Sequence, residues 1–401
     1  MDNSEIKRKL NSINWNFDFT IEYGKDILQP FNCRKYYSYP ATFIPEIPYA
    51  LIEILSQKGD TVLDPFGGIG TTFMQALSLQ RAPYSFDINP VASMVCTTLY
   101  KLFDPSTDKE NIKNQLLSIC SEYKVETDYT ENTSSQRAEL SKWFEKSTFN
   151  EISFLFRQCD SFNDQTTQDV MKLILSSILV TLSSQNKGWA YIADNVKPKP
   201  DELRKKNTFE HYRNSVNNLL NDVVEHEARL PNTYKSFYTK ISQEPRIFTD
   251  SIINSNIASG TINLIITSPP YPRMIDYVKS QRLSFNFLND NFKEYVEQET
   301  GARYRRTRKH CLEDYENSIN TINKKLVTLL HEEGYLCVVL PDYEFTDNRK
   351  IVIDKIVEEF NALGLSKVYE VGRYIPSHKR TLSIQWATLV NEKIYIFQKG
   401  K

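Results

Sequence analysis

Seven short apolar runs, separated by segments with helical spacing, most constrain what this chain can fold into. Several runs are continuously apolar, as in parallel strands that are buried on both faces. Between them, apolar residues recur every three or four positions, as in helices that cover a sheet. This alternation predicts an α/β fold with a Rossmann-like, doubly wound seven-stranded sheet and helices on both faces. The predicted strands are Thr61–Asp64, Tyr84–Ile88, Arg246–Asp250, Leu264–Thr267, Tyr335–Leu340, Lys367–Gly372 and Lys393–Lys399.

The alternation stops between residues 103 and 244. This stretch holds helical patterns and no clear strand, so we expect a helical insertion between the second and third strands. The chain then divides into residues 1–102, the insertion 103–244 and residues 245–401. The predicted helices are Pro45–Gln57, Thr71–Gln80, Val91–Leu102, Tyr315–Glu332 and Lys350–Leu363 in the flanking parts, and Phe149–Phe156, Val170–Leu182 and Phe209–Val224 in the insertion.

The composition excludes several classes of protein. Hydrophobic residues make up 40% and charged residues 25% of the 401 residues, and the net charge of -1 gives no overall attraction to nucleic acid or membrane. The six cysteines form no CxxC pair, which argues against a zinc site or a disulfide framework and favours a reducing compartment. There is no signal-peptide core, and the longest apolar run is too short to span a bilayer. We expect a cytoplasmic enzyme.

A glycine-rich turn follows the first predicted strand, in the segment DPFGGIGTT (Asp64–Thr72). An acidic residue, then glycines, then a helix start is how α/β proteins build nucleotide-like sites. Gly67, Gly68 and Gly70 would let a ligand approach the backbone, and the following amides could donate to it. A phosphate-binding P-loop would need a lysine, which is missing here. A plain structural turn is the alternative.

Polar residues also end three other predicted strands. Asp87 ends the second strand, Asp250 the third and Ser268 the fourth. Because the carboxyl ends of parallel strands share one edge of a sheet, these residues and Asp64 should meet there. Asp87 is placed to accept hydrogen bonds from both hydroxyls of a ribose. Ser268 opens the sequence SPPY, in which two prolines remove backbone donors and fix the direction of the chain. A rigid turn is the simpler interpretation of that sequence.

Taken together, these segments resemble the S-adenosylmethionine-dependent DNA amino-methyltransferases of restriction–modification systems. The resemblance rests on YPATFIP (Tyr39–Pro45), DPFGGIGTT and TSPPY, in this order, and covers roughly residues 36–100 and 245–400. It implies S-adenosylmethionine as the cofactor, double-stranded DNA as the partner and a cognate restriction endonuclease as a further possible partner. TSPPY resembles the form usual among N4-cytosine enzymes, whereas a leading Asp is more usual among N6-adenine enzymes.

The resemblance also assigns residues to the cofactor. In the family the glycine loop holds the methionine part, the YPA-type segment closes over it, and an acidic residue corresponding to Asp87 binds the ribose. The implied cofactor residues are Tyr39, Thr42, Phe43, Asp64, Pro65, Phe66, Gly67, Gly70, Thr71, Asp87, Asn89 and Asp250. Two departures stand out. Ser38 replaces a more usual histidine, and no recognition domain is evident after the last strand, so the insertion is the expected target-recognition region.

The SPPY loop is expected to be catalytic. Methylating an exocyclic amine requires its nitrogen to rehybridise while acceptors hold its N–H groups, and Ser268 Oγ and the Pro269 carbonyl, stiffened by Pro270, are such acceptors. Tyr271 would stack on a flipped base, worth roughly 1–3 kcal/mol against a flipping cost of a few kcal/mol. Ring-carbon methylation would need a cysteine nucleophile, and its usual Pro-Cys context is missing. No metal is required, and the histidines show no metal spacing.

A basic run, RYRRTRKH, follows the catalytic loop. Its expected DNA contacts are Arg303, Arg305, Arg306, Arg308 and Lys309, and the alternative is a solvated face. A second basic stretch, Asn186–Lys206, lies in the insertion. The leading hypothesis is a methyltransferase acting on N4 of cytosine in a short duplex site. The same machinery could act on N6 of adenine or on a base in RNA, and a non-catalytic DNA-binding subunit is a third hypothesis.

Overall fold

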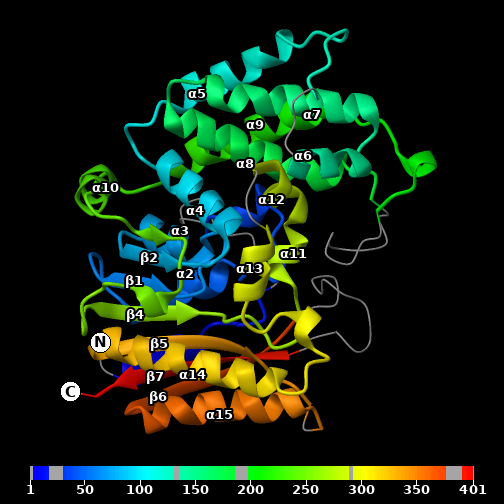
Figure 1. Cartoon of the computed structure of the whole chain (residues 1–401). Coiled ribbons are helices and arrows are strands. Elements are labelled where there is room, and N and C mark those ends of the chain that lie inside the picture. Colours follow the sequence, from blue (N-terminus) through cyan, green and yellow to red (C-terminus); the bar gives the residue numbers. More distant parts are fainter. Residues whose placement is uncertain are drawn as a thin grey trace.

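The computed structural model describes residues 3–17, 30–130, 135–185, 197–288, 292–344, 346–375 and 391–400. A seven-stranded sheet with the order β3-β2-β1-β4-β5-β7-β6 lies at its centre (Figure 1). The predicted Rossmann-like α/β fold is therefore confirmed, and each predicted strand is present. The strands are β1 (Thr61–Asp64), β2 (Ala82–Phe86), β3 (Ile247–Phe248), β4 (Ile262–Thr267), β5 (Leu330–Pro341), β6 (Leu365–Tyr374) and β7 (Asn391–Lys399).

The order of the strands fixes where a ligand can bind. β1 pairs in parallel with β2 on one side and with β4 on the other, and β7 lies antiparallel between β5 and β6. From β1 the chain proceeds outward to β2 and β3, and then returns to β4 on the opposite side. The strand order thus reverses between β1 and β4. In open α/β sheets the crevice beyond the carboxyl ends at such a point is the usual ligand site.

The second strand differs from its prediction by two residues at each end. It begins at Ala82 rather than Tyr84, and it includes Pro83, which pairs with Val62 of β1. Proline is normally excluded from central strands because it lacks a backbone donor. Here the neighbouring β3 pairs only with Ser85 and Phe86, so Pro83 has no partner strand to donate to on that side. The short β3 explains why a proline is tolerated in this strand.

Helices cover both faces of the sheet. Val62, Leu264 and Ile266 face α1 (Asn3–Asn11), α2 (Glu46–Leu55) and α3 (Thr71–Ser78). The alternate residues Leu63 and Ile265 face α14 (Cys311–Leu329) and α15 (Asn348–Ala362). Three short helices, α11 (Tyr277–Ser280), α12 (Arg282–Leu288) and α13 (Phe292–Gln298), follow the loop after β4. None of the helices in the described ranges is long and apolar enough to cross a membrane.

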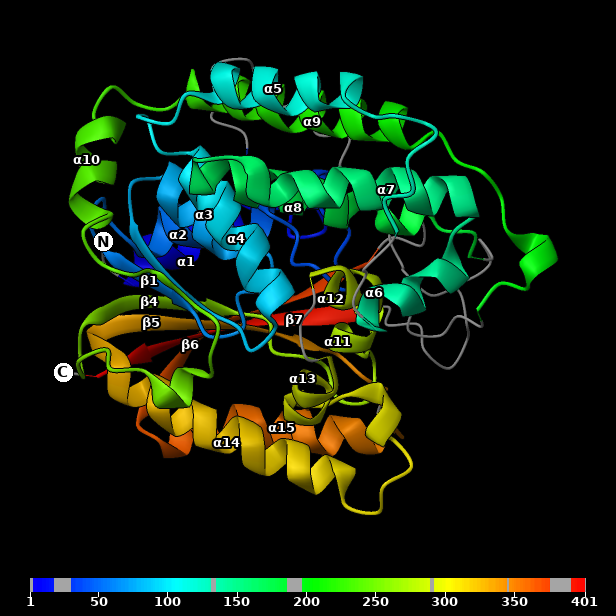
Figure 2. The same ribbon diagram turned by 45° about the horizontal axis from the view of Figure 1, so that its top comes forward.

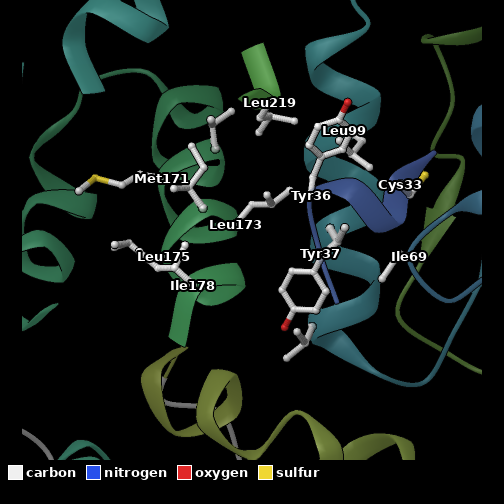
Figure 3. Packing of buried hydrophobic residues seen from close by; sticks show 14 of the residues in the cluster. Cys33, Tyr36, Tyr37, Ile69, Leu99, Met171, Leu173, Leu175, Ile178 and Leu219 are labelled. Atoms are coloured by element: carbon white, nitrogen blue, oxygen red, sulfur yellow. The ribbon is translucent and has the colours of Figure 1, made fainter. Parts of the chain in front are cut away.

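The stretch between β2 and β3 forms a helical layer over α3 and α4 (Pro90–Leu102), and its described residues include no strand (Figures 1 and 2). Its helices are α5 (Lys109–Ser118), α6 (Ser135–Leu140), α7 (Lys146–Gln158), α8 (Gln165–Leu182), α9 (Thr208–Glu227) and α10 (Tyr234–Ile241). Figure 3 shows Leu173 of α8 facing Tyr36, and Ile178 of α8 belongs to the same hydrophobic core as Tyr37 and Leu99. The layer is therefore packed onto the sheet domain by a continuous core.

Candidate active site

A cavity of about 550 Å³ opens where the strand order reverses, at the carboxyl ends of β1, β2 and β4. The four strand-end residues Asp64, Asp87, Asp250 and Ser268 all line it. Of the cofactor residues expected from the sequence, all except Gly70 line the cavity: Tyr39, Thr42, Phe43, Asp64, Pro65, Phe66, Gly67, Thr71, Asp87, Asn89 and Asp250. Of the expected catalytic residues, Ser268 and Pro270 line it, whereas Pro269 and Tyr271 do not.

Asp64 organises the turn between β1 and α3. Its side chain is 4% exposed and accepts hydrogen bonds from the Phe66 amide (3.1 Å) and the Thr72 hydroxyl (2.6 Å). Burial raises the pKa of Asp64 to about 6, and these hydrogen bonds oppose the rise. The carboxylate therefore fixes the start of α3 and places a negative charge at the cavity wall at neutral pH.

Asp87 connects the ends of β1 and β2. It accepts hydrogen bonds from the amides of Gly68 and Asn89, both at 2.8 Å, and burial raises its pKa to about 6. Asn89 in turn accepts a hydrogen bond from the Val91 amide and caps α4, with Pro90 in the first turn. The local sequence FDINP therefore encodes both the strand end and the helix start.

The amides of the three glycines in the loop are bonded to other groups of the protein. The Gly67 amide donates to the Phe86 carbonyl, the Gly68 amide to Asp87, and the Gly70 amide to the Gly67 carbonyl. These three donors are engaged within the protein rather than directed to a ligand. At Gly67 the close approach is that of the protein itself, because an added Cβ would lie 1.9 Å from the Ser85 hydroxyl.

Gly70 lies outside the cavity. Its φ of +90° and an added-Cβ distance of 2.4 Å to the Cys96 sulfur make glycine necessary for packing α3 against α4. In this structure Gly70 serves helix packing, and its expected cofactor contact stays a prediction. Gly67, which lines the cavity, and Gly70, which packs against α4, belong to the same GGIG sequence, and that sequence does not reveal which glycine faces the ligand.

The YPA-type segment lies over the glycine loop. Tyr39 is 7% exposed, its hydroxyl accepts from the side-chain amide of Asn89 at 3.3 Å, and its ring lies 5.9 Å from that of Tyr277. Asp250, by contrast, is exposed and bonds only within its own turn, to the Ser251 amide and the Asn254 side chain. Tyr39 is therefore held rigidly in the cavity wall, whereas Asp250 lies in a surface turn at the rim.

Two residues of the expected catalytic loop, Pro269 and Tyr271, do not line the cavity, and Tyr271 is engaged elsewhere. Tyr271 is 9% exposed, lies outside the cavity lining and donates its hydroxyl to Glu392 at 2.8 Å. Because Tyr271 is not among the residues that line the cavity, its expected stacking on a base stays a prediction. Tyr277, in the segment that follows, lines the cavity instead.

Sequence reasoning also missed a buried acid in the wall. Glu299 is 4% exposed, lines the cavity and accepts hydrogen bonds from the amides of Tyr277 (2.6 Å) and Val278 (3.2 Å). Burial raises its pKa to about 8. A single glutamate within EYVEQETG carries no sequence signal, since only the fold turns it inward. Ser318, Thr321 and Ile322 of α14 complete this side.

The basic run is partly engaged with the protein. Arg303–Arg305 forms a 3₁₀ turn, in which Arg305 donates to the Tyr304 hydroxyl (2.9 Å) and lies 3.6 Å from Glu297. Arg306, Arg308 and Lys309 have exposed side chains. Of the second basic stretch, residues 186–196 lie outside the described residues, and Lys197 pairs with Glu139.

Comparisons with known proteins agree with this geometry. A family model described as DNA methylase matches residues 5–95. The type II methyltransferase M.BsoBI of Geobacillus stearothermophilus is 26% identical over 276 residues, which cover 65% of this chain and 53% of that protein. The type II methyltransferase M.MvaI of Kocuria varians is 22% identical over 309 residues, covering 71% and 63%. The chain thus spans between half and two thirds of the length of these relatives.

A solved structure is also similar at low level. The rRNA methyltransferase aviRa from Streptomyces viridochromogenes aligns with 90% of this chain and 88% of its own, at 9% identity and a TM-score of 0.32. That score is too low to bear on the site. The local evidence is instead the cavity and the residues that line it.

Proposed function

We propose that this chain is a DNA amino-methyltransferase of the restriction–modification type, which transfers a methyl group from S-adenosylmethionine to the exocyclic N4 of cytosine in duplex DNA; its similarity to a DNA methylase family model and to type II methyltransferases supports this proposal. The transfer is direct, and the target base is flipped out of the helix to reach the cavity. The site residues that we assign below carry this proposal.

The composition of the cavity wall is the observation that supports the cofactor site. Three aspartates line it (Asp64, Asp87 and Asp250), together with Glu299, whose pKa of about 8 keeps it mostly protonated at neutral pH, and the described lining residues include no lysine or arginine. Such a wall disfavours phosphate groups and favours a ligand with positive charge. S-adenosylmethionine carries a sulfonium and an ammonium group, and a cavity of about 550 Å³ lies within the usual range for small-molecule sites. The residues present therefore fit this cofactor.

Within the wall, three groups would hold the cofactor. Asp87 has lone pairs left over from its two amide bonds, and these would accept the ribose hydroxyls. The backbone at Gly67, which lines the cavity, would lie against the methionine part. Tyr39 and Phe43 would cover the opposite side. When bound, the cofactor supplies a methyl group that its sulfonium makes electrophilic.

The loop after β4 would hold the target amine. We assign Ser268 Oγ and the Pro269 carbonyl as acceptors for its N–H groups, because the nitrogen must rehybridise as it reacts. Tyr277 lines the same cavity as Ser268 and takes the stacking role expected of Tyr271. All six cysteines lie within the described residues and none lines the cavity. That arrangement supports direct transfer to an amine over ring-carbon methylation, which needs a thiolate.

DNA would approach past the basic run. Arg306, Arg308 and Lys309 are exposed, and Gln298 to Thr300 just before the run line the cavity, so phosphate contacts here would hold a duplex beside the opening. Arg303 and Arg305 would support the 3₁₀ turn that carries these side chains. A short loop of this kind gives position rather than sequence specificity.

The helical layer of residues 103–244 is our candidate for target recognition. It packs against α4 and contacts the segment after the catalytic loop at α12. There the Tyr37 hydroxyl is bonded to Ser176 of α8, to Gln281 at the end of α11, and to Ser284 of α12. These buried bonds would hold the layer rigidly against residues 1–102 and 245–401. A restriction endonuclease that reads the same site would be the partner of the system.

The product identifies the reaction. Plasmid DNA from cells that express the chain is digested to nucleosides, and modified bases are quantified by mass spectrometry, with Ser268→Ala as the matched control. N4-methylcytosine in the wild type alone supports the proposal. N6-methyladenine would instead support the adenine enzyme, and methylated RNA nucleosides an RNA enzyme. Cofactor binding without any methylated product would support a non-catalytic DNA-binding subunit.

A further inference from the structure

The tyrosine of the SPPY loop does not line the cavity and belongs to a buried network of hydrogen bonds. Tyr271 is 9% exposed, and its hydroxyl donates to Glu392 Oε1 at 2.8 Å. Ser268 Oγ in turn donates to the Tyr271 hydroxyl at 3.3 Å. Since Ser268 lines the cavity and Tyr271 does not, this network of hydrogen bonds runs from the candidate catalytic group to the interior of the protein.

The inner end of this hydrogen-bond network is held by β6 and β7, the last two strands in the sequence. Glu392 of β7 lies directly opposite Arg373 of β6 in the antiparallel register, and the two side chains form an ion pair of 2.5 Å. They are 13% and 6% exposed, respectively. The Arg373 side chain also donates to the Trp15 carbonyl at 3.3 Å. Removing one partner of so buried a pair leaves an uncompensated charge, so the pair fixes Glu392 in place.

The direction of the hydrogen bonds follows from the chemistry of the groups. A carboxylate paired with a guanidinium only accepts, so the Tyr271 hydroxyl must give its proton to Glu392. The oxygen of Tyr271 is then free to accept, and the Ser268 proton is directed to it. The remaining lone pairs of Ser268 are therefore available to a ligand in the cavity. Burial, together with the nearby Glu392, raises the pKa of Tyr271 well above its ordinary value, so the hydroxyl keeps its proton.

We propose that Tyr271, held by Glu392, is a positioning residue that orients Ser268 as a hydrogen-bond acceptor for the target amine. The inference rests on the proposed function, because only an amine substrate needs an acceptor here. Without Tyr271 the serine hydroxyl would rotate freely and would point its proton at the amine for part of the time. The bond of 3.3 Å is longer than an ordinary O–H···O bond, so it orients Ser268 and does not activate it.

Tyr271→Phe separates this role from stacking. Phenylalanine keeps the ring, so a stacking residue would tolerate the change, whereas a positioning residue would lose its hydroxyl. We expect kcat for methylation to fall about five- to tenfold, with the cofactor Kd and the KM for DNA unchanged. The matched control is Tyr315→Phe, because Tyr315 is 2% exposed and its hydroxyl has no hydrogen-bond partner among the described residues. Equal kcat values for Tyr271→Phe and the wild type would overturn the inference.

A double-variant cycle tests whether Glu392 acts through Tyr271. In Glu392→Gln the new amide can donate to the Tyr271 oxygen, which would turn the tyrosine proton toward Ser268 and occupy the lone pair needed by the amine. We expect kcat for this variant to be at least as low as for Tyr271→Phe. The variant with both changes should be no slower than Tyr271→Phe alone. If the two changes lowered kcat by the product of their separate factors, Glu392 would act independently of Tyr271, and the inference that it acts through Tyr271 would be refuted.

A spectroscopic readout keeps this test separate from the proposed function. In the full chain labelled with ¹³Cζ-tyrosine, the Tyr271 resonance is identified by its loss in Tyr271→Phe. It should shift in Ser268→Ala and again in Glu392→Gln, while Tyr315→Phe leaves it in place. A wild-type chain that methylates no DNA would refute the proposed function, yet these shifts would still test the hydrogen-bond chain. A Tyr271 resonance that is unmoved by Ser268→Ala would overturn the inference in either case.

Discussion

The two walls of the cavity are built in different ways. On the wall formed by β1 and β2, the bonds join residues that are close in the sequence: Asp64 and Thr72 are 8 positions apart, and Gly68 and Asp87 are 19 apart. On the wall formed by the loop after β4, Tyr271 depends on Glu392, 121 positions away. Glu392 pairs with Arg373, which in turn reaches Trp15 across 358 positions.

The difference has consequences for how each wall works. The first wall can form from two neighbouring strand–helix units, and its polar groups are already engaged before a ligand binds. The second wall is complete only when β6 and β7 have joined the sheet, because Glu392 and Arg373 come from those strands. We therefore expect cofactor binding and amine positioning to respond separately to mutation.

Among variants that separate cofactor binding from amine positioning, Asp87→Ala should have the largest effect. Losing a charged hydrogen-bond acceptor costs about 1.5–3 kcal/mol, so the Kd for S-adenosylmethionine should rise roughly tenfold to hundredfold by calorimetry. Asp104→Ala is the matched control, because Asp104 is a loop carboxylate that bonds the Ser106 amide and hydroxyl and does not line the cavity. An unchanged Kd for Asp87→Ala would reject the ribose role.

Ser268→Ala should affect only the second wall. Turnover should fall roughly tenfold or more, which corresponds to about 1.4 kcal/mol for each factor of ten, while the cofactor Kd stays as in the wild type. Ser318→Ala is a suitable control, since Ser318 also lines the cavity but its hydroxyl bonds to the Asp314 carbonyl of its own helix. Near-normal turnover in Ser268→Ala would contradict the acceptor role.

The same contrast explains what the sequence could predict. The fold, the acidic strand ends and nearly all of the cofactor wall follow from local patterns, such as DPFGGIGTT and the Asn89-Pro90 cap of α4. The inward turn of Tyr271 does not, because it depends on a carboxylate that arrives with the last strand. Glu299 is likewise brought in by the path of the chain after α13. Gly70 shows what a motif alone cannot predict: it belongs to the glycine-rich motif but packs on Cys96 instead of lining the cavity.

Acid should weaken cofactor binding through the first wall. Burial raises the pKa values of Asp64 and Asp87 to about 6, and a cationic ligand favours their ionised forms. Between pH 7 and pH 5 both carboxyls gain protons that the ligand must displace, so the affinity should fall several-fold. The contribution of these two groups to the stability of the free chain has the opposite sign: the folded state holds their protons more tightly, so that contribution rises as the pH falls from about 6 to about 4.

Calorimetry across this pH range checks the prediction, with Asp87→Asn as the reference variant. The amide of that variant does not titrate, so the pH dependence should become shallower by the share that belongs to Asp87. An affinity that stays constant from pH 7 to pH 5 would show that the carboxyls do not face the positive charge. A fall of the same steepness in Asp87→Asn would assign the effect to Asp64 alone.

The smallest effect is expected outside both walls, on the basic run. Replacing Arg306, Arg308 and Lys309 by Gln removes up to three phosphate contacts, each worth about 0.9 in the slope of log K against log salt, so the slope for DNA binding should flatten by roughly 2 to 3. At one moderate salt concentration the affinity should fall only a few-fold, and the cofactor Kd should not change.

Lys235 and Lys240 provide the matched control for this variant. Both are exposed on α10, which lies at the end of the molecule opposite α11 and α13 (Figures 1 and 2). Their replacement by Gln removes two positive charges rather than three, and it should leave the slope as it is, because a duplex held beside the cavity does not reach α10. Equal flattening in both variants would mean that DNA is attracted by overall charge. No flattening in either would make the basic run a solvated face, and the duplex would then have to be held by the helical layer of residues 103–244.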